Sequence, residues 1–204
     1  MVSTLRMLRV LVLGLSLGVP FALAQAPGKT NAPDASDIVV HVQKNGETII
    51  VDVEMMVQAS TLAVWDVLTD YDHMAQFVAN VHSSRVAERR GNNLVVAQQS
   101  STSFGLLKFS FDNVREVELV PRSEIRSKLI SGDMKASAFT TRIVTDSSGV
   151  TRVINHGEFV PTMWVPPLVG TAFIESETRR QFVELRKEMM RRAGAAKAAA
   201  PAVQ

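Results

Sequence analysis

Four histidines are the first residues whose side chains could carry chemistry, and they stand at positions 41, 73, 82 and 156. No two of them have the close spacing that brings zinc ligands together on one helix. His156 and Glu158 are two residues apart on a predicted strand and share one face, but two ligands are too few for a metal site. We expect this pair to be polar residues of the surface or of a cavity, and the sequence predicts no metal and no cofactor.

Nucleophilic catalysis has no better support in the sequence. The chain contains no cysteine, which excludes a thiol nucleophile, an iron–sulfur cluster and a disulfide scaffold. The run Ser100–Ser103 lies in a predicted strand without the Gly-x-Ser-x-Gly turn of a serine hydrolase, and its hydroxyls either face solvent or line a cavity. Asp70 and Asp72 follow a predicted helix, where a Thr-Asp-Tyr-Asp stretch is typical of a turn. No residue is therefore predicted to be catalytic.

Residues 107–119 contain a departure from a regular strand pattern. Alternate positions are apolar and are predicted to face the interior: Leu107, Phe109, Phe111, Val117 and Leu119. Asn113 and Arg115 have the same parity. Either a β-bulge near residues 112–114 shifts the phase of the strand, or the amide and the guanidinium point inward. A buried arginine must pair with an acid, such as a partner glutamate, or bind an acidic ligand, and in the last case Arg115 would anchor the ligand's polar head.

The amino-terminal segment has the pattern of a secretory signal peptide. Arg6 and Arg9 precede an apolar stretch from Val10 to Leu23, and Ala22-Leu23-Ala24 forms a small-x-small cleavage site. The stretch is short for a membrane span and contains Pro20. We expect cleavage after Ala24 and a periplasmic protein.

Loss of residues 1–24 would change the charge of the chain. The full chain has 22 Lys and Arg residues, 20 Asp and Glu residues and a net charge of +2. Residues 1–24 contain Arg6 and Arg9 and no acid, so the remainder is neutral. Binding to nucleic acid needs a surplus of positive charge along a surface, and we expect no such partner.

The rest of the chain is predicted to form one domain at residues 38–193, between a flexible leader at 25–37 and a low-complexity tail at 194–204. A hairpin around Asn45-Gly46 opens the domain, and a helix capped by Ser60 and a short second helix follow it. Turn residues recur between residues 81 and 161 without a helical period, which indicates consecutive antiparallel strands. The predicted fold class is α+β.

One long helix, from about Leu168 to Arg192, is predicted to end the domain. Its apolar face consists of Ile174, Phe182, Leu185 and Met189. The side expected to face water contains Glu184, Arg186, Lys187, Glu188, Arg191 and Arg192. An antiparallel sheet must bury its apolar face, and this helix is the only large cover that the sequence offers, so we expect a cavity between the two.

The run VWDVLTDY at residues 64–71 is followed by MAQFVANV at 74–81, and GEFVP at 157–161 is followed by WVPP at 164–167. With the terminal helix, these stretches resemble the START-related superfamily, and within it the branch of polyketide cyclases and coenzyme-Q-binding proteins. The resemblance covers about residues 48–192. It implies the helix-grip fold, in which a curved antiparallel sheet wraps around the C-terminal helix and encloses an apolar cavity. Members include carriers, receptors and cyclases, so the resemblance assigns no catalytic residue.

The resemblance and the export signal favour an exported protein that binds or carries an apolar small molecule, such as a lipid, a quinone or a polyketide-like compound. A cyclase or dehydratase that uses polar cavity residues is the alternative, and a structural module with a filled cavity is a third. Trp164 either packs the corner before the last helix or lies at the cavity mouth, where it touches the ligand or, transiently, a membrane. The sequence sets no oligomeric state. The expected ligand-binding residues are Asn113, Arg115, Thr141, His156, Glu158, Trp164, Phe173 and Thr178.

Overall fold

The computed structural model of the chain describes residues 37–104, 107–147 and 150–199. Within these ranges the chain forms eight strands, two α-helices and one 3-10 helix. The α+β class predicted from the sequence is confirmed. The expected signal peptide, nearly all of the leader and residues 200–204 of the tail lie outside the described residues.

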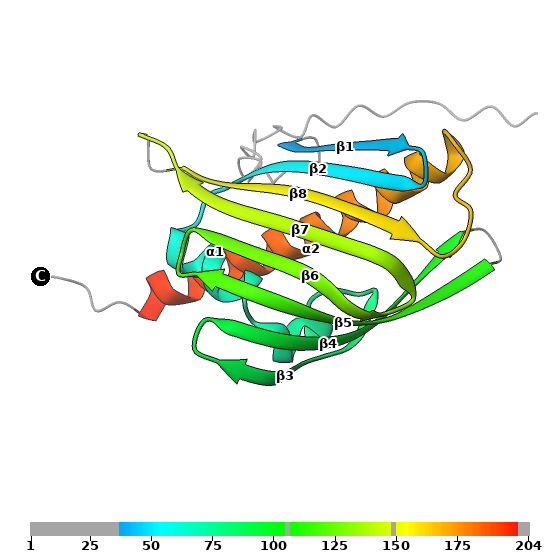
Figure 1. The fold of residues 1–204 in the computed structure, drawn as a ribbon. Helices are drawn as coiled ribbons and strands as arrows, with labels where there is room; N and C mark the ends of the chain where they lie inside the picture. The colour runs from blue at the N-terminus through cyan, green and yellow to red at the C-terminus, as the bar shows by residue number, and fades with distance from the viewer. Residues whose placement is uncertain (1–36, 105–106, 148–149, 200–204) are drawn as a thin grey trace, which may run out of the picture. The chain divides into compact units, whose positions relative to one another are not determined.

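The eight strands belong to one antiparallel sheet (Figure 1). They are β1 Ile38–Asn45, β2 Thr48–Val57, β3 Val81–Arg90, β4 Asn93–Phe104, β5 Leu107–Val120, β6 Glu124–Gly132, β7 Met134–Thr145 and β8 Thr151–Pro161. Their order across the sheet is β1-β2-β8-β7-β6-β5-β4-β3. The strands from β3 to β8 therefore form a meander, as predicted, and β8 returns beside the amino-terminal hairpin.

Three helical elements accompany the sheet. The helix α1 (Thr61–Leu68) and the 3-10 helix η2 (Tyr71–Gln76) connect β2 to β3, and α2 (Val169–Ala199) follows β8. Ser60 caps α1 as predicted, because its Oγ accepts a hydrogen bond from the Ala63 amide at 3.2 Å. The helix α2 continues to Ala199 rather than ending near Arg192, because the segment 193–199 is mostly alanine, the residue with the highest helix propensity.

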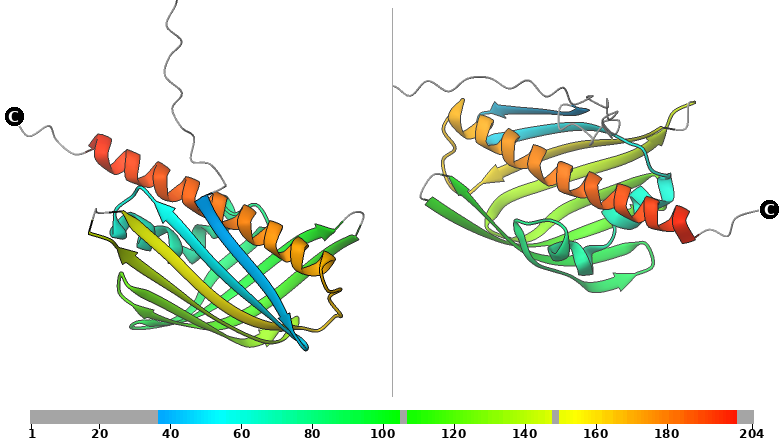
Figure 2. Two further views of the ribbon diagram at one scale, coloured as in Figure 1. Left: turned by 90° about the horizontal axis from the view of Figure 1, so that it is seen from above. Right: turned by 180° about the vertical axis from the view of Figure 1, so that it is seen from behind.

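The helix α2 crosses the concave face of the sheet (Figure 2). It packs on β1, β2 and α1, where the predicted alternation of β2 is confirmed: Ile49, Val51, Val53, Met55 and Val57 are buried. Strands β4 to β7 lie farther from α2 along the curve of the sheet. The apolar face of those strands is therefore not covered by α2, and α1 and η2 cover only one end of it, which leaves room for the cavity described below.

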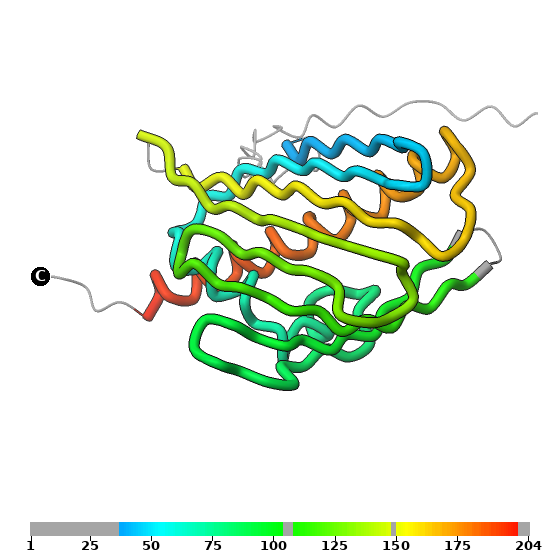
Figure 3. The backbone as a smooth tube through the Cα atoms, viewed as in Figure 1, coloured from blue at the N-terminus to red at the C-terminus, as the bar shows by residue number. Residues whose placement is uncertain are grey.

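The connections between successive strands lie at opposite ends of the sheet. The turn after β1, the turn after β6 and the segment from β8 to α2 lie at one end of the sheet, and α1 lies at the other (Figure 3). We call the end with the segment from β8 to α2 the mouth end, and the end with α1 the closed end.

Candidate functional site: a cavity between the sheet and α2

A cavity of about 750 Å³ lies between the inner face of the sheet and the first half of α2. Its walls are mostly apolar, and six phenylalanines line it: Phe109, Phe111, Phe139, Phe159, Phe173 and Phe182. This volume falls within the range of roughly 300–1,000 Å³ that is usual for small-molecule sites. The expected cavity between sheet and helix is therefore present.

The two ends of the cavity differ. At the closed end, η2 and the sheet form a packed cluster of Tyr71, Leu94, Val96, Val117, Leu119 and Ile125. At the mouth end, Met163 and Trp164 line the cavity but also face solvent, and the Trp164 side chain is 74% exposed. The cavity is consequently blocked by core residues on one side and reaches the surface on the other.

Arg115 points into this cavity. Strand β5 pairs with β4 in unbroken register from the pair Glu118–Asn93 to the pair Leu107–Phe104, so β5 keeps its phase throughout. The alternative of a bulge in β5 is not what the structure has: the bulge is in β6, where Ile130 is an extra residue opposite the step from Val114 to Arg115. Because β5 itself is regular, Arg115 stays on the same face as Val117 and Leu119, and its side chain lines the cavity.

The Arg115 guanidinium has an aromatic neighbour in place of an acidic one. Its Cζ lies 5.8 Å from the centroid of the Tyr71 ring, within the range of a cation–π contact. Burial lowers the pKa of Arg115, and burial likewise raises the pKa of the Tyr71 phenol, although the neighbouring cation opposes that rise. Among the described residues no carboxylate pairs with Arg115. The partner glutamate that the sequence left open is thus not observed there.

Asn113 provides a buried polar atom without a partner among the described residues, two residues from Arg115. Its Oδ1 atom is buried and has no hydrogen-bond partner in the described part of the chain. Asn113 and Arg115 are two residues apart on one strand face, so both side chains are presented to the same region of the cavity. A buried polar atom without a partner costs free energy, and a ligand that supplies the missing hydrogen bond would recover it.

Four more of the predicted ligand-binding residues line the cavity: Thr141, Trp164, Phe173 and Thr178. Thr141 is already engaged within the wall, because its Oγ1 accepts a hydrogen bond from Asn155 Nδ2 at 2.8 Å. Thr178 and Phe173 lie on the cavity face of α2, and Trp164 lies at the mouth. The structure therefore brings six of the eight predicted residues to one cavity.

His156 and Glu158 are not among them, and this part of the prediction is wrong. On β8 the residues Val153, Asn155 and Gly157 are buried, so the alternate positions 156 and 158 face outward. The His156 Nδ1 atom lies 2.7 Å from Asp52 Oδ1 on the outer face of the sheet, and this contact raises the pKa of the imidazole.

Several cavity residues were not predicted from the sequence. Asn155 could have been found by the parity of β8, since it alternates with Val153 and Gly157. Tyr71 and Glu177 come from separate helices, and their positions depend on tertiary packing. Glu177 lines the cavity from α2 and accepts a hydrogen bond from Thr102 Oγ1 at 2.8 Å, so part of the polar run on β4 does face inward.

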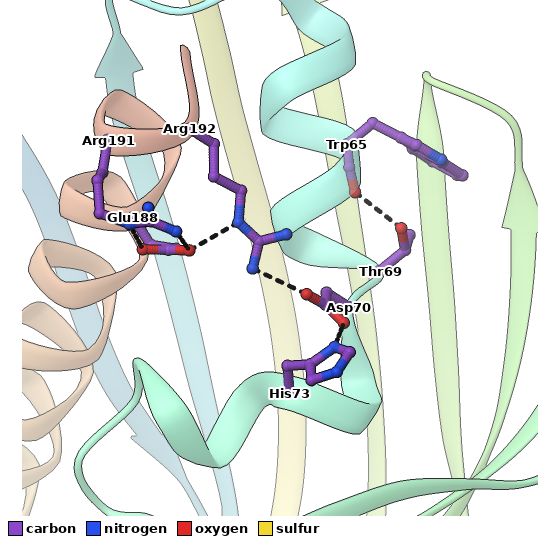
Figure 4. A network of polar contacts seen from close by, with 7 residues as sticks. All are labelled: Trp65, Thr69, Asp70, His73, Glu188, Arg191 and Arg192. Carbon is purple, nitrogen blue, oxygen red and sulfur yellow. Dashed lines mark hydrogen bonds and ion pairs between the residues drawn. The ribbon is translucent and has the colours of Figure 1, made fainter. Parts of the chain in front are cut away.

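A second polar cluster lies outside the cavity, where the end of α2 meets the segment between α1 and η2 (Figure 4). Arg192 donates to Asp70 Oδ2 at 2.8 Å and to Glu188 Oε1 at 2.6 Å, and Arg191 also donates to Glu188. The hydrogen bond from Arg191, followed by that from Arg192, lowers the pKa of Glu188 to about 2. Burial opposes a low pKa at Asp70, but hydrogen bonds with His73 and Arg192 lower it.

This cluster also corrects the expected water-facing side of α2. Lys187 and Arg191 are exposed as predicted, but Glu188 and Arg186 are buried. Glu184 accepts a hydrogen bond from the Ala79 amide at 2.9 Å. The second half of α2 therefore has contacts on more than one side, because the segment between α1 and β3 packs against it.

Two other kinds of site are not found in the described residues. No group of three or more His, Asp and Glu side chains there is arranged to hold a metal ion. No helix among them combines the length and the apolar character that a membrane span requires.

Comparison with known proteins supports this description. The sequence model of the family described as polyketide cyclase / dehydrase and lipid transport matches residues 57–182. A search of curated proteins finds no relative of this chain.

Solved structures share the fold. A STAR-related lipid transfer protein from Xanthomonas axonopodis has a TM-score of 0.62 and 14% identity, over 78% of this chain and 97% of that one. The Zhui aromatase/cyclase from Streptomyces sp. R1128 has a TM-score of 0.57 and 17% identity, over 76% and 99% of the two chains. A START superfamily protein from Mycobacterium smegmatis has a TM-score of 0.56 and 14% identity, over 72% and 98%. The helix-grip arrangement predicted from the sequence is confirmed by these likenesses.

Proposed function

Since the chain belongs to the polyketide cyclase / dehydrase and lipid transport family, we propose that it binds and carries an elongated apolar small molecule, with a polar oxygen of that molecule at Arg115. The family match confirms the resemblance predicted from the sequence. Family membership indicates hydrophobic small molecules as ligands, and the identity of the ligand and its orientation in the cavity are the parts that we propose.

The observation that carries the proposal is a cation at the closed end of an apolar cavity. Arg115 retains its charge in any protein environment, and here it has a ring contact instead of a carboxylate. A carboxylate, a phosphate or a quinone oxygen of a ligand would accept hydrogen bonds from the guanidinium. The apolar remainder of the ligand would then extend along the phenylalanine side chains toward the mouth.

A cyclase or dehydratase is the second candidate, supported by the presence of ionisable groups of both signs in one cavity. Arg115 could polarise a carbonyl oxygen, and Glu177 lines the same cavity from α2. His156 and Glu158 cannot be cavity residues of such an enzyme, because both lie on the outer face of the sheet. The carrier proposal needs no general base, and we therefore place it first.

Export to the periplasm is part of the same proposal and is motivated by residues 1–24. Protein recovered from the periplasmic fraction should begin at Gln25 when its amino terminus is sequenced. A membrane-embedded product that retains Met1 would contradict this expectation.

Replacement of Arg115 by methionine tests the polar anchor. Methionine keeps the length of the side chain and removes its charge, so affinity for a fluorescent fatty acid should fall by about 1.5–3 kcal/mol. Affinity for the fatty alcohol of the same chain should change less, because the alcohol has no negative charge for Arg115 to bind. Fluorescence titration with both probes measures the difference. The free energy of unfolding should not fall, since the variant removes a half-buried cation that lacks an acidic partner among the described residues.

Arg152→Met is the matched control, because Arg152 lies on the outer face, where it pairs with Glu54. It should bind both probes as the parent does. If Arg115→Met lowers the affinity for the acid and for the alcohol equally, Arg115 is not the polar anchor. If the parent binds no apolar probe, the protein is not a carrier of such molecules. Mass spectrometry of the extracted probe addresses the enzyme: a carrier returns it unchanged, whereas a dehydratase acting on a hydroxylated probe returns a product lighter by one water.

A further inference from the structure

The segment between β8 and α2 exposes an unusual amount of apolar surface. Leu168 is 82% exposed and Trp164 is 74% exposed, more than any other large hydrophobic side chain whose exposure the structure describes. Val169 and Met163, in the same segment, are 56% and 46% exposed. Large apolar side chains gathered in one exposed place commonly mark a surface that contacts another molecule or a membrane. We call these four side chains the mouth patch.

Backbone contacts hold the mouth patch in its exposed position. Lys44 Nζ donates to the Val165 carbonyl at 3.0 Å, and the Gly170 amide donates to the Pro166 carbonyl at 3.0 Å. A Cβ atom at Gly170 would lie 2.5 Å from Val165 Cγ1, so the segment and the first turn of α2 are in close contact. Leu168 has a φ of 64°, a left-handed conformation that is uncommon for leucine. The chain thus holds a strained leucine with its side chain in solvent.

The mouth patch is continuous with the cavity. Met163, Trp164 and Val169 line the cavity and are also exposed, so the same side chains form its rim and the adjacent surface. An apolar ligand that enters or leaves by this end must cross that rim. A partner that covers the patch would therefore receive the ligand directly, without exposing its chain to water.

Positive charge accompanies the patch. Lys44 Nζ lies 5.7 Å from the centroid of the Trp164 ring, and Lys108 and Lys135 lie on strands that begin at the same end of the sheet. Acidic residues are at this end too: Glu47 pairs with Lys135, and Asp133 accepts a hydrogen bond from the amide of Asp112, which carries a third carboxylate. Tryptophan and lysine side chains are both suited to the boundary between lipid headgroups and acyl chains.

We propose that the mouth end docks on the surface of a lipid bilayer, with Trp164 and Leu168 inserted at the boundary between headgroups and acyl chains. The proposal rests on the proposed carrier function, and it names the place from which the ligand is taken or to which it is delivered. A bilayer fits better than a protein partner, because four side chains are far fewer than the roughly 20–30 residues that each side of a stable protein interface contributes. A few apolar side chains are enough for reversible binding to a membrane surface.

Leu168→Asn tests this docking surface. Asparagine tolerates a left-handed backbone better than leucine does, so the melting temperature should be unchanged or higher. Flotation with vesicles of phosphatidylethanolamine and phosphatidylglycerol should show binding weakened about five- to tenfold, because an apolar side chain no longer enters the bilayer. The protein used begins at Gln25, since every described helix and strand lies after that residue. Met56→Asn is the matched control, because Met56 is 49% exposed on β2, near the closed end.

A second readout reports on Trp164 itself. Brominated lipids in the vesicles should quench part of the tryptophan fluorescence of the parent, and Trp164→Phe should lose that part and keep the signal of Trp65. Vesicles of phosphatidylcholine alone should bind more weakly, since they offer no anionic headgroup to the lysines.

Three results would overturn the membrane proposal. The first is that Leu168→Asn binds vesicles as tightly as the parent does. The second is that Leu168→Asn has both a lower melting temperature and weaker vesicle binding. The third is that the parent does not bind vesicles and instead self-associates through the patch in sedimentation experiments. Titration with the soluble fatty acid, performed without vesicles, separates these results from failure of the carrier function. Leu168→Asn should retain the affinity of the parent in that titration.

Discussion

The two halves of α2 are held to the rest of the molecule in different ways. In the second half, Met189 is completely buried against the core of β1, β2 and α1. Arg192 links Glu188 of this half to Asp70 (Figure 4). The Arg192 guanidinium also lies 5.3 Å from the centroid of the Phe77 ring. The buried side chains of α2 in the described residues all belong to this half: Arg186, Glu188 and Met189.

The first half of α2 has no buried side chain between Val169 and Arg179. Its apolar residues, such as Phe173 and Ile174, face the cavity. Its polar ties are few: Thr102 donates to Glu177, and Arg179 donates to the Ile38 carbonyl. The comparison indicates a division along one helix, in which the second half stabilises the fold and the first half leaves apolar surface for a ligand to cover.

A pair of alanine substitutions tests this division. Met189→Ala should lower the free energy of unfolding by about 2–5 kcal/mol, because it leaves a cavity in a fully packed site. Ile174→Ala removes a side chain that already borders a cavity and should cost only about 1 kcal/mol. Urea unfolding of both variants measures the difference, and titration with the fatty acid probe should show the reverse order of effects. Equal losses of stability would mean that the first half of α2 is also part of the core.

The fold could be predicted from the sequence largely because its turns are local signals. Asn45-Gly46 forms the predicted turn after β1, with Gly46 at a φ of 60°, and Gly132-Asp133 separates β6 from β7. Strand and helix types follow from periodicity, which one sequence displays directly. The end of α2 was missed because alanine-rich segments have low complexity and yet form helix well when they continue one.

The cavity residues could be predicted only where strand parity determines their side. The parity of β5 indicated that Asn113 and Arg115 share the inner face, and the unbroken β4–β5 register removes the alternative of a bulge in β5. For His156 the parity of β8 was used only to place it on one face with Glu158, and that face was not compared with the alternate positions, such as Val153, which are buried. The contact between Arg115 and Tyr71 joins residues from two distant elements, and no local pattern in the sequence encodes such a contact.

The pH dependence of stability offers a smaller test of the second half of α2. Hydrogen bonds from Arg191 and Arg192 lower the pKa of Glu188 from 4.5 to about 2. A carboxylate whose pKa is lower in the folded state stabilises the fold above its unfolded pKa, and this contribution is lost as the pH falls from about 4.5 toward 2. Glu188→Gln should therefore lower the free energy of unfolding by about 1–2 kcal/mol at pH 7, and this difference from the parent should shrink as the pH falls through that interval.

Glu175→Gln is the matched control for this prediction, because Glu175 pairs with Arg179 in the first half of the same helix and is more exposed. A surface pair of this kind contributes little, so the control should change stability by less than about 0.5 kcal/mol. Urea unfolding of the three proteins between pH 7 and pH 3 gives the required free energies. If Glu188→Gln and Glu175→Gln behave alike at every pH, the ion pairs at the closed end do not hold α2 in place, and the division between its two halves depends on the burial of Met189 alone.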